Sequence, residues 1–294
     1  MLKKGVYAAT LSVLNNDSSL NVEATINHAE QIIAKGLHGV FFFGSTGQSQ
    51  LISMTEKKDL ISKLSTRKQK KKFFIGTGNN SLNETIELIK YSIEYEFDTF
   101  LIMPPAYYKN NTDQGIYNFY SSIIHHIPKV KIVLYNFEKL SGYKFSPEAL
   151  KKLVKSFPKN IIGCKDSSYN LFEDVKIKNF LMFPGSESKL LKGLELGCAG
   201  CISAVTNVTH SLSRKVFDDF ELKNNQVSNK KLIDVRNIFD RYNLISALHT
   251  YFSIKNKAYI NLLPPLVLLD KEKSNELQKS LEKINFNGFE NKAA

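Results

Sequence analysis

The sequence predicts an α/β protein folded as a closed (β/α)8 barrel, or TIM barrel, with a helical C-terminal extension. Short apolar runs alternate with longer amphipathic ones over most of the chain, and the short runs number eight. No G-x-G-x-x-G follows the first run, which disfavours an open dinucleotide-binding sheet. Barrels of this kind need about 250 residues, and this chain has 294.

The eight short apolar runs are the expected strands. Their length and apolar character are typical of strands that are buried in a parallel sheet. In chain order they are Val6–Leu11, Gly39–Phe43, Phe73–Thr77, Thr99–Met103, Lys131–Tyr135, Ile161–Lys165, Leu181–Pro184 and Gly200–Ser203.

Amphipathic patterns between these runs predict helices. Thr55 is expected to begin the second helix, and Ser146-Pro147-Glu148 is a helix start signal for the fourth. The expected helices are Val22–Ala34, Thr55–Leu64, Leu82–Tyr95, Pro147–Val154, Ser186–Leu196 and Val208–Phe220.

The strand pattern stops near Asn225. Three helical patterns follow it, at Val227–Tyr242, Leu244–Lys255 and Lys271–Ile284. We therefore expect a catalytic barrel over residues 1–224 and a helical extension over 225–294 that packs on it.

Composition limits the class of protein. The formal net charge is +12, but the densest basic cluster, Arg67–Lys72, lies where a solvated loop belongs, so no nucleic-acid partner is expected. No run reaches the roughly 20 apolar residues of a membrane span, and the start Met1–Gly5 lacks the apolar stretch of a signal peptide. We expect a cytoplasmic protein without a membrane partner.

The cysteines and histidines predict neither a disulfide framework nor a metal site. Three cysteines, Cys164, Cys198 and Cys201, are an odd and small number. The pair Cys198 and Cys201 has C-x-x-C spacing but no second ligand pair, and the six histidines show no ligand spacing. We interpret the cysteines as buried core residues and expect no metal or other cofactor.

Lys165 is the most informative residue. It ends the sixth expected strand, where burial of an unpaired ammonium costs roughly several kcal/mol. A desolvated lysine loses its proton, and a neutral amine attacks carbonyl groups. The alternative is a salt-bridged rim lysine, which the following Asp166 would suit.

Other polar residues also follow expected strand ends, which in such barrels form the catalytic rim. This set suits iminium chemistry on a 2-oxo acid: Tyr135, Ser45 and Tyr108 provide hydroxyls for a proton relay, and the Gly44–Gly47 turn provides amide and hydroxyl donors for a carboxylate. The rim positions are Gly44-Ser45-Thr46-Gly47, Tyr107-Tyr108, Tyr135-Asn136, Lys165, Gly185 and Ile202-Ser203.

These motifs resemble, in order and spacing, the dihydrodipicolinate synthase / N-acetylneuraminate lyase family of class I aldolases. The matching segments are Gly44–Gly47, Gly76–Gly78, Pro105–Tyr108, Tyr135-Asn136, Gly163–Ser168, Gly185-Ser186 and Gly200–Ser203. The resemblance implies a barrel, a homotetramer arranged as a dimer of dimers, and pyruvate as the 2-oxo acid.

The resemblance also implies roles for the site residues. Lys165 forms the Schiff base, Tyr135 shuttles the proton, and Ser45 and Thr46 bind the carboxylate. Tyr108 reaches across a dimer interface. Backbone at Gly47, Gly185 and Ile202 completes the substrate site, with Ile202 facing the lysine.

One departure concerns the second substrate. Leu140 stands where dihydrodipicolinate synthases place an arginine for a carboxylate, and an apolar side chain cannot replace a guanidinium. Leu140-Ser141-Gly142 is similar to sialic acid lyases, although Ala204 stands where those lyases place a serine. Gln48 and Glu138 also replace a usual glutamate and proline.

The sequence therefore predicts a pyruvate-dependent class I lyase or aldolase acting on a 2-oxo-3-deoxy sugar acid or a related 2-oxo acid. The first alternative is 4-hydroxy-tetrahydrodipicolinate synthase, with Lys139 or another cation in the role of the arginine. The second is a barrel that binds 2-oxo acids without turnover.

Overall fold

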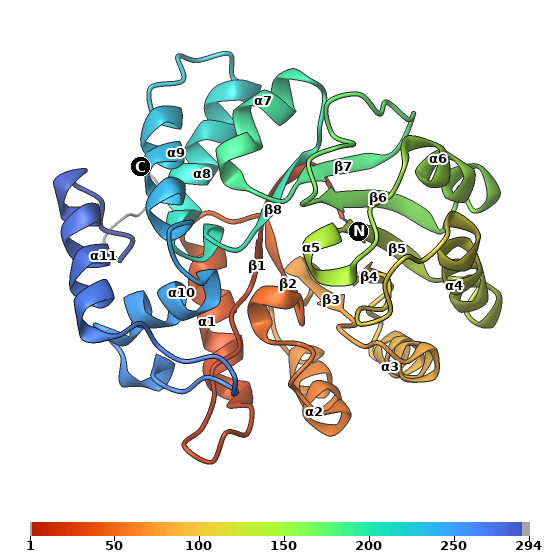
Figure 1. Cartoon of the computed structure of the whole chain (residues 1–294), viewed down its shortest axis with the longest axis horizontal. Coiled ribbons are helices and arrows are strands. Elements are labelled where there is room, and N and C mark those ends of the chain that lie inside the picture. Colours follow the sequence, from red (N-terminus) through yellow and green to blue (C-terminus); the bar gives the residue numbers. More distant parts are fainter. Residues whose placement is uncertain (1, 290–294) are drawn as a thin grey trace.

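Eight parallel strands form the barrel in the computed structural model, which describes residues 2–289 (Figure 1). Neighbouring strands follow the order β7-β6-β5-β4-β3-β2-β1-β8. The amide of Ala199, just before β8, donates to Met182 O in β7 at 2.8 Å, so the last two strands also meet. The strands are β1 (Gly5–Ala9), β2 (Gly39–Phe42), β3 (Phe73–Gly76), β4 (Thr99–Ile102), β5 (Lys131–Asn136), β6 (Ile161–Asp166), β7 (Leu181–Pro184) and β8 (Gly200–Ser203).

All eight predicted strands are confirmed; β7 and β8 match the predicted ranges, and the others differ by one or two residues at their ends. β1 begins at Gly5 and ends at Ala9, while β5 and β6 extend by one residue to Asn136 and Asp166. Every residue of β1, β2, β3, β4 and β8 is buried. This burial explains the continuous apolar runs in the sequence.

Helices surround the barrel (Figure 1). They are α1 (Val22–Ala34), α2 (Met54–Leu64), α3 (Leu82–Glu94), α4 (Asp113–His126), α5 (Glu138–Ser141), α6 (Pro147–Ser156), α7 (Leu190–Glu195) and α8 (Thr206–Glu221). The prediction that Thr55 begins the second helix is wrong. Ser53 is its N-cap, because its hydroxyl accepts from the Glu56 amide while the Glu56 carboxylate accepts from the Ser53 amide at 2.9 Å.

The alternation of strands and helices is interrupted between β6 and β7. Residues 167–180 contain turns and bends and no helix. The buried Asp166 carboxylate accepts from the amides of Tyr169, Leu171 and Phe172 at 2.8–3.0 Å. These bonds replace the internal bonds of a helix, and they hold the segment in an irregular path.

Two helices were not predicted. α4 lies between β4 and β5 and is capped by Thr112, whose side chain accepts from the Gly115 amide. Its buried face includes Ile116, Tyr120 and Ile123. α5 is a single turn directly after β5, and therefore lies at the C-terminal end of the barrel, in front of the strands in Figure 1.

The barrel interior is packed with large side chains. The Tyr7 ring makes edge contacts with Phe41, Phe74 and Phe183 at centroid distances of 5.7–5.9 Å. The same buried cluster contains Tyr135 and Ile202. The interior is thus a core, and access to inward-facing residues is from the strand ends.

Three further helices pack together after α8, and the first of them contacts α8: α9 (Asn229–Phe239), α10 (Leu244–Ser253) and α11 (Lys271–Lys283). Their buried residues share one core cluster with Leu11 and Val13, which follow β1, and with Val205 and Val208. The predicted C-terminal helices are confirmed, with shorter ends. The predicted boundary at residue 224, between the catalytic barrel and the helical extension, stays a prediction.

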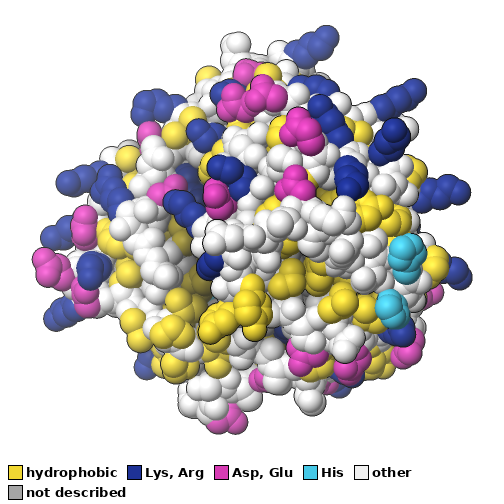
Figure 2. Space-filling view, turned by 45° about the vertical axis from the view of Figure 1, so that its right-hand side comes forward, with side chains coloured by type: hydrophobic (Ala, Val, Ile, Leu, Met, Phe, Trp, Pro, Cys, Tyr) yellow, Lys and Arg dark blue, Asp and Glu magenta, His cyan; other side chains and the backbone are white. Residues whose placement is uncertain are grey.

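Basic side chains are spread over the surface and interspersed with acidic ones (Figure 2). In the predicted basic loop, Arg67 pairs with Glu23, and Lys70 pairs with Glu96. The three cysteines are buried, as predicted. Among the helices of residues 2–289, none has the length and apolar character needed to cross a membrane.

Candidate active site

Lys165 lies inside the barrel near the end of β6. It pairs in register with Tyr135 of β5 and Phe183 of β7, and its side chain is 3% exposed. The neighbouring Asp166 side chain is bound by the backbone amides described above. Residues 2–289 provide no ion pair for Lys165, so the interpretation as a salt-bridged rim lysine is wrong.

Tyr135 joins Lys165 to the turn after β2. Lys165 Nζ lies 4.2 Å from the centre of the Tyr135 ring. The Tyr135 hydroxyl lies 3.1 Å from Ser45 Oγ, within hydrogen-bond distance. An amine, a phenol and a hydroxyl are thus brought together from β6, β5 and the β2 turn, as the sequence predicts.

The turn Gly44–Gly47 is held in an unusual conformation. It forms the 3-10 helix η1 (Ser45–Gly47) and is flanked by Phe43 (φ +53°) and Gln48 (φ +55°), both in the left-handed region. Non-glycine residues adopt this region only where the surrounding structure fixes them. Gln48 is fixed by its side-chain oxygen, which accepts from the Leu263 amide at 2.8 Å.

Only part of the turn's backbone is free to bind a ligand. The Gly47 amide donates to Gly44 O at 3.0 Å, and the Gln48 amide donates to Ser45 O at 3.1 Å. Gly47 O accepts from the Ser12 hydroxyl at 2.7 Å. The amides of Ser45 and Thr46 have no acceptor within the described chain. The amide and the carbonyl of Gly47 are thus bonded within the chain, whereas the amides of Ser45 and Thr46 are not. Carboxylate binding at this turn stays a prediction.

Gly185 directly follows β7, and Ile202 lies in the neighbouring β8. The Gly185 amide donates to Asp166 O at 2.8 Å, and a Cβ atom at Gly185 would lie 1.9 Å from Ser167 Oγ. This close approach requires glycine. Ile202 is fully buried in the interior cluster with Tyr135.

Tyr108 is not brought to Tyr135 or Ser45 within one chain. It is 74% exposed, and its ring contacts Tyr107, which is 79% exposed and has φ +85°. The preceding Ala106 amide donates to Asn80 Oδ1 at 2.9 Å. The loop after β4 therefore displays two aromatic rings to solvent.

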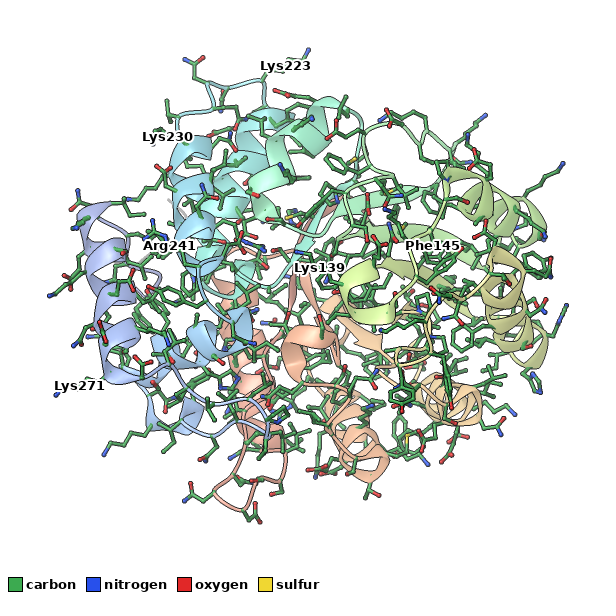
Figure 3. All side chains as sticks on the ribbon, in the orientation of Figure 1. Lys139, Phe145, Lys223, Lys230, Arg241 and Lys271 are labelled. Atoms are coloured by element: carbon green, nitrogen blue, oxygen red, sulfur yellow. The ribbon has the colours of Figure 1, made fainter. Side chains whose placement is uncertain are left out.

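Leu140 lies on α5 and is partly exposed. Figure 3 shows the neighbouring Lys139 in front of the strands, at the catalytic end. The Lys144 ammonium pairs with Glu138 at 3.3 Å, whereas Lys139 forms no ion pair in the described part of the chain.

A buried ionic cluster behind the rim was missed by sequence reasoning. Glu187, in η3 (Glu187–Lys189), accepts from Arg236 of α9 at 3.1 Å and from the Ser203 hydroxyl. Arg236 also donates to Asp240 at 2.8 Å. Glu187 Oε1 is buried and has no partner among residues 2–289. The only sequence feature that could have indicated this cluster is the position of Arg236, which lies between the apolar Val235 and Ile238.

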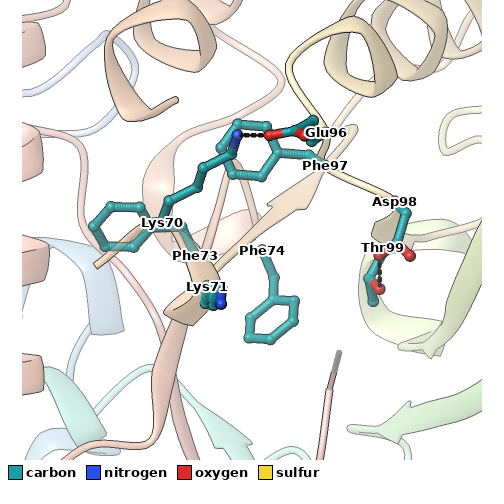
Figure 4. A pocket seen from close by; sticks show the side chains of 8 residues that line it. All are labelled: Lys70, Lys71, Phe73, Phe74, Glu96, Phe97, Asp98 and Thr99. Atoms are coloured by element: carbon teal, nitrogen blue, oxygen red, sulfur yellow. Dashed lines mark hydrogen bonds and ion pairs between the residues drawn. The ribbon is translucent and has the colours of Figure 1, made fainter. Parts of the chain in front are cut away.

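A pocket of about 290 Å³ opens near the N-terminal ends of β3 and β4, at the end of the barrel opposite Lys165 (Figure 4). Within its lining, Lys70 binds Glu96 at 2.5 Å, and Thr99 donates to Asp98 at 2.8 Å. This pocket lacks the amine and hydroxyl groups that the catalytic end brings together. Across residues 2–289, the His, Cys, Asp and Glu side chains form no group of three or more that could hold a metal ion.

Known proteins resemble this chain over nearly its full length. The model of the dihydrodipicolinate synthetase family matches residues 2–284. A 2-dehydro-3-deoxy-D-gluconate/2-dehydro-3-deoxy-phosphogluconate aldolase of Picrophilus torridus is 29% identical over 81% of this chain and 92% of its own length. A 4-hydroxy-tetrahydrodipicolinate synthase of Bartonella bacilliformis is 32% identical over 73% of this chain and 74% of its own.

Solved structures share the fold. The 2-keto 3-deoxygluconate aldolase from Picrophilus torridus superposes with a TM-score of 0.81 at 25% identity, covering 91% of this chain and 98% of that one.

Proposed function

Because the chain belongs to the dihydrodipicolinate synthetase family, we propose that it is a Schiff-base-forming lyase that cleaves or condenses pyruvate with an aldehyde. The proposed substrate is a 2-oxo-3-deoxy sugar acid or a related 2-oxo acid. The observation that carries the proposal is the buried Lys165 amine against Tyr135, whose hydroxyl lies 3.1 Å from Ser45.

Lys165 is the proposed nucleophile. Its amine adds to the 2-oxo carbon, and the adduct loses water to give a protonated imine. The imine then accepts the electron pair of the breaking C3–C4 bond and becomes an enamine. Protonation at C3 and addition of water release pyruvate and regenerate the amine.

Tyr135 is the proposed proton carrier. In cleavage, the C4 hydroxyl must lose a proton as the aldehyde forms, and the Tyr135 oxygen is the proposed acceptor. The Ser45 hydroxyl, 3.1 Å from it, is the next proposed member of the relay. In condensation the proton moves in the opposite direction.

The substrate carboxylate is proposed to bind at η1. The amides of Ser45 and Thr46 have no internal acceptor among the described residues, and each residue also carries a hydroxyl. Backbone amides in such a turn bind anions without a cation. Gly185 and Ile202 form the neighbouring walls.

Trapping with borohydride tests the chemistry. Pyruvate and borohydride should give a stable covalent adduct on Lys165 that is located by peptide mass spectrometry. Lys165→Ala should give none. An unmodified wild-type protein, or equal trapping in Lys165→Ala, contradicts the proposal.

A second candidate is 4-hydroxy-tetrahydrodipicolinate synthase, which condenses pyruvate with aspartate semialdehyde. It is supported by the relative from Bartonella bacilliformis and by Lys139 at the catalytic end. Leu140 argues against this second function, because an apolar side chain stands where the synthases have an arginine for the carboxylate of aspartate semialdehyde. Comparison of pyruvate release from 2-oxo-3-deoxy sugar acids with pyruvate consumption in the presence of aspartate semialdehyde separates the two. A trappable imine without turnover of any 2-oxo acid would instead favour a binding protein.

We also propose that the enzyme is cytoplasmic and acts as a homotetramer, a dimer of dimers. The exposed rings of Tyr107 and Tyr108 support a subunit contact, because such side chains are enriched in interfaces. In a dimer, Tyr108 of a second copy would complete the relay at Tyr135. Sedimentation velocity should show a tetramer, and Tyr108→Ala should weaken both assembly and turnover.

A further inference from the structure

Lys57 is a second buried lysine, on the inner face of α2. It is 1% exposed and lies among Leu60, Ile61 and Leu64. The described residues give it no carboxylate in ion-pair contact. Its ammonium instead donates to Thr77 O at 3.0 Å, Gly78 O at 3.4 Å and Asn79 Oδ1 at 2.5 Å. Burial lowers the pKa of Lys57 to about 8, and the charge of Glu84 opposes this shift.

Lys57 binds the segment 77–79, and the end of β3 packs against the residues that flank the turn at Ser45. Gly78 approaches Ser49 so closely that a Cβ atom on Gly78 would lie 2.3 Å from Ser49 Cβ. A Cβ atom on Gly76 would lie 2.7 Å from Phe43 O. Lys57 Nζ also lies 6.0 Å from the centre of the Phe43 ring. The end of β3 thus touches both sides of the turn.

The turn needs such support. Phe43 and Gln48 have positive φ, a backbone conformation that is unfavourable for residues other than glycine. A backbone under strain relaxes unless its neighbours prevent it. Gln48 is held by Leu263, while Phe43 rests on the β3 end that Lys57 binds.

We propose that Lys57 is a positioning residue for carboxylate binding: its buried ammonium fixes Thr77, Gly78 and Asn79, and these hold the turn that presents Ser45 and Thr46 to the 2-oxo acid. This proposal rests on the proposed function. A methionine at position 57 fills similar space but cannot donate to three oxygen atoms. Loss of the Lys57 ammonium should therefore lower the affinity for the substrate and leave the reactivity of Lys165 unchanged.

The test measures imine trapping at a series of pyruvate concentrations. Lys57→Met should raise the half-saturating pyruvate concentration about tenfold, while saturating pyruvate still labels Lys165 fully. Lys58→Met is the matched control, because Lys58 is on the same helix and pairs with Glu87 at the surface. It should leave the half-saturating concentration within about twofold of the wild-type value. Melting temperatures are measured in parallel.

The outcomes are separable. A folded Lys57→Met protein with a lower melting temperature and a wild-type half-saturating concentration overturns the positioning role. If Lys57→Met does not fold, Asn79→Ala removes one acceptor and should raise the same concentration roughly two- to fivefold; no rise overturns the proposal. Absence of any adduct in the wild-type protein overturns the proposed function as well.

Discussion

The Tyr135 ring covers the Lys165 amine, with 4.2 Å between Nζ and the ring centre, while the Tyr135 hydroxyl lies 3.1 Å from Ser45 Oγ. The ring face and the hydroxyl therefore have separable roles. In the proposed mechanism the ring face covers the amine, and the hydroxyl belongs to the proton relay.

Substitution Tyr135→Phe tests this separation. It keeps the ring against Lys165 and removes the hydroxyl, so kcat for cleavage should fall roughly 10²- to 10⁴-fold while borohydride trapping persists. Steady-state kinetics and peptide mass spectrometry measure the two effects. Ser45→Ala should lower kcat less, because Tyr135 remains. Loss of trapping in Tyr135→Phe would show that the hydroxyl is needed to form the imine.

Leu140→Arg tests specificity for the second substrate. A guanidinium on α5 adds a donor for a carboxylate, so the ratio of kcat/KM for aspartate semialdehyde to that for a sugar acid should rise about tenfold or more. Leu140→Met keeps an apolar side chain and should leave this ratio unchanged. A ratio that does not respond to arginine would place the selectivity elsewhere on the rim.

Arg236→Met tests the buried ionic cluster. It leaves the Glu187 carboxylate buried without a cation, which should lower the free energy of unfolding by about 3–5 kcal/mol. Denaturant unfolding measures the change. Arg236→Met combined with Glu187→Gln should recover part of the loss. Lys230→Met, which breaks an exposed pair with Asp234 on the same helix, should cost about 1 kcal/mol or less.

The buried His28 ring should make the folded protein less stable in mild acid. It is buried between Tyr259 and Asn207, with both ring nitrogens 2.8 Å from their partners, and burial lowers its pKa from 6.5 to about 4. The unfolded chain therefore binds the proton first. The stability contributed by the neutral ring is present above pH 6.5 and is lost as the pH falls towards 4.

At pH 5 this one histidine should cost about 2 kcal/mol of unfolding free energy relative to pH 7.5. Urea denaturation across this range measures it. His28→Gln should flatten the dependence, whereas substitution of the exposed His126 should not. Equal slopes in wild type and His28→Gln would contradict the assignment.

The strands and the central site residues could be predicted because their signals are local. A strand buried on both faces is apolar throughout, and polar residues at strand ends, such as Tyr135 and Lys165, stand out against it. Parallel pairing of adjacent strands then brings those two together in register.

The other features depend on partners that are distant in the sequence. Arg236 binds Glu187 across 49 positions, and Lys57 binds Thr77 across 20, so neither sequence segment predicts the contact. The irregular path after β6 depends on the buried Asp166 carboxylate rather than on local propensity. Tyr108 was predicted as part of the relay, but no contact within one chain brings it there.

The pairing of β1 with β8 has a consequence for biosynthesis. Gly5 is the register partner of Gly200, so the first strand leaves the ribosome long before its second neighbour exists. Leu11, just beyond β1, also shares a core with Leu277 of α11. During translation the nascent chain must therefore keep one apolar edge of β1 from aggregating until β8, which ends at Ser203, has been made.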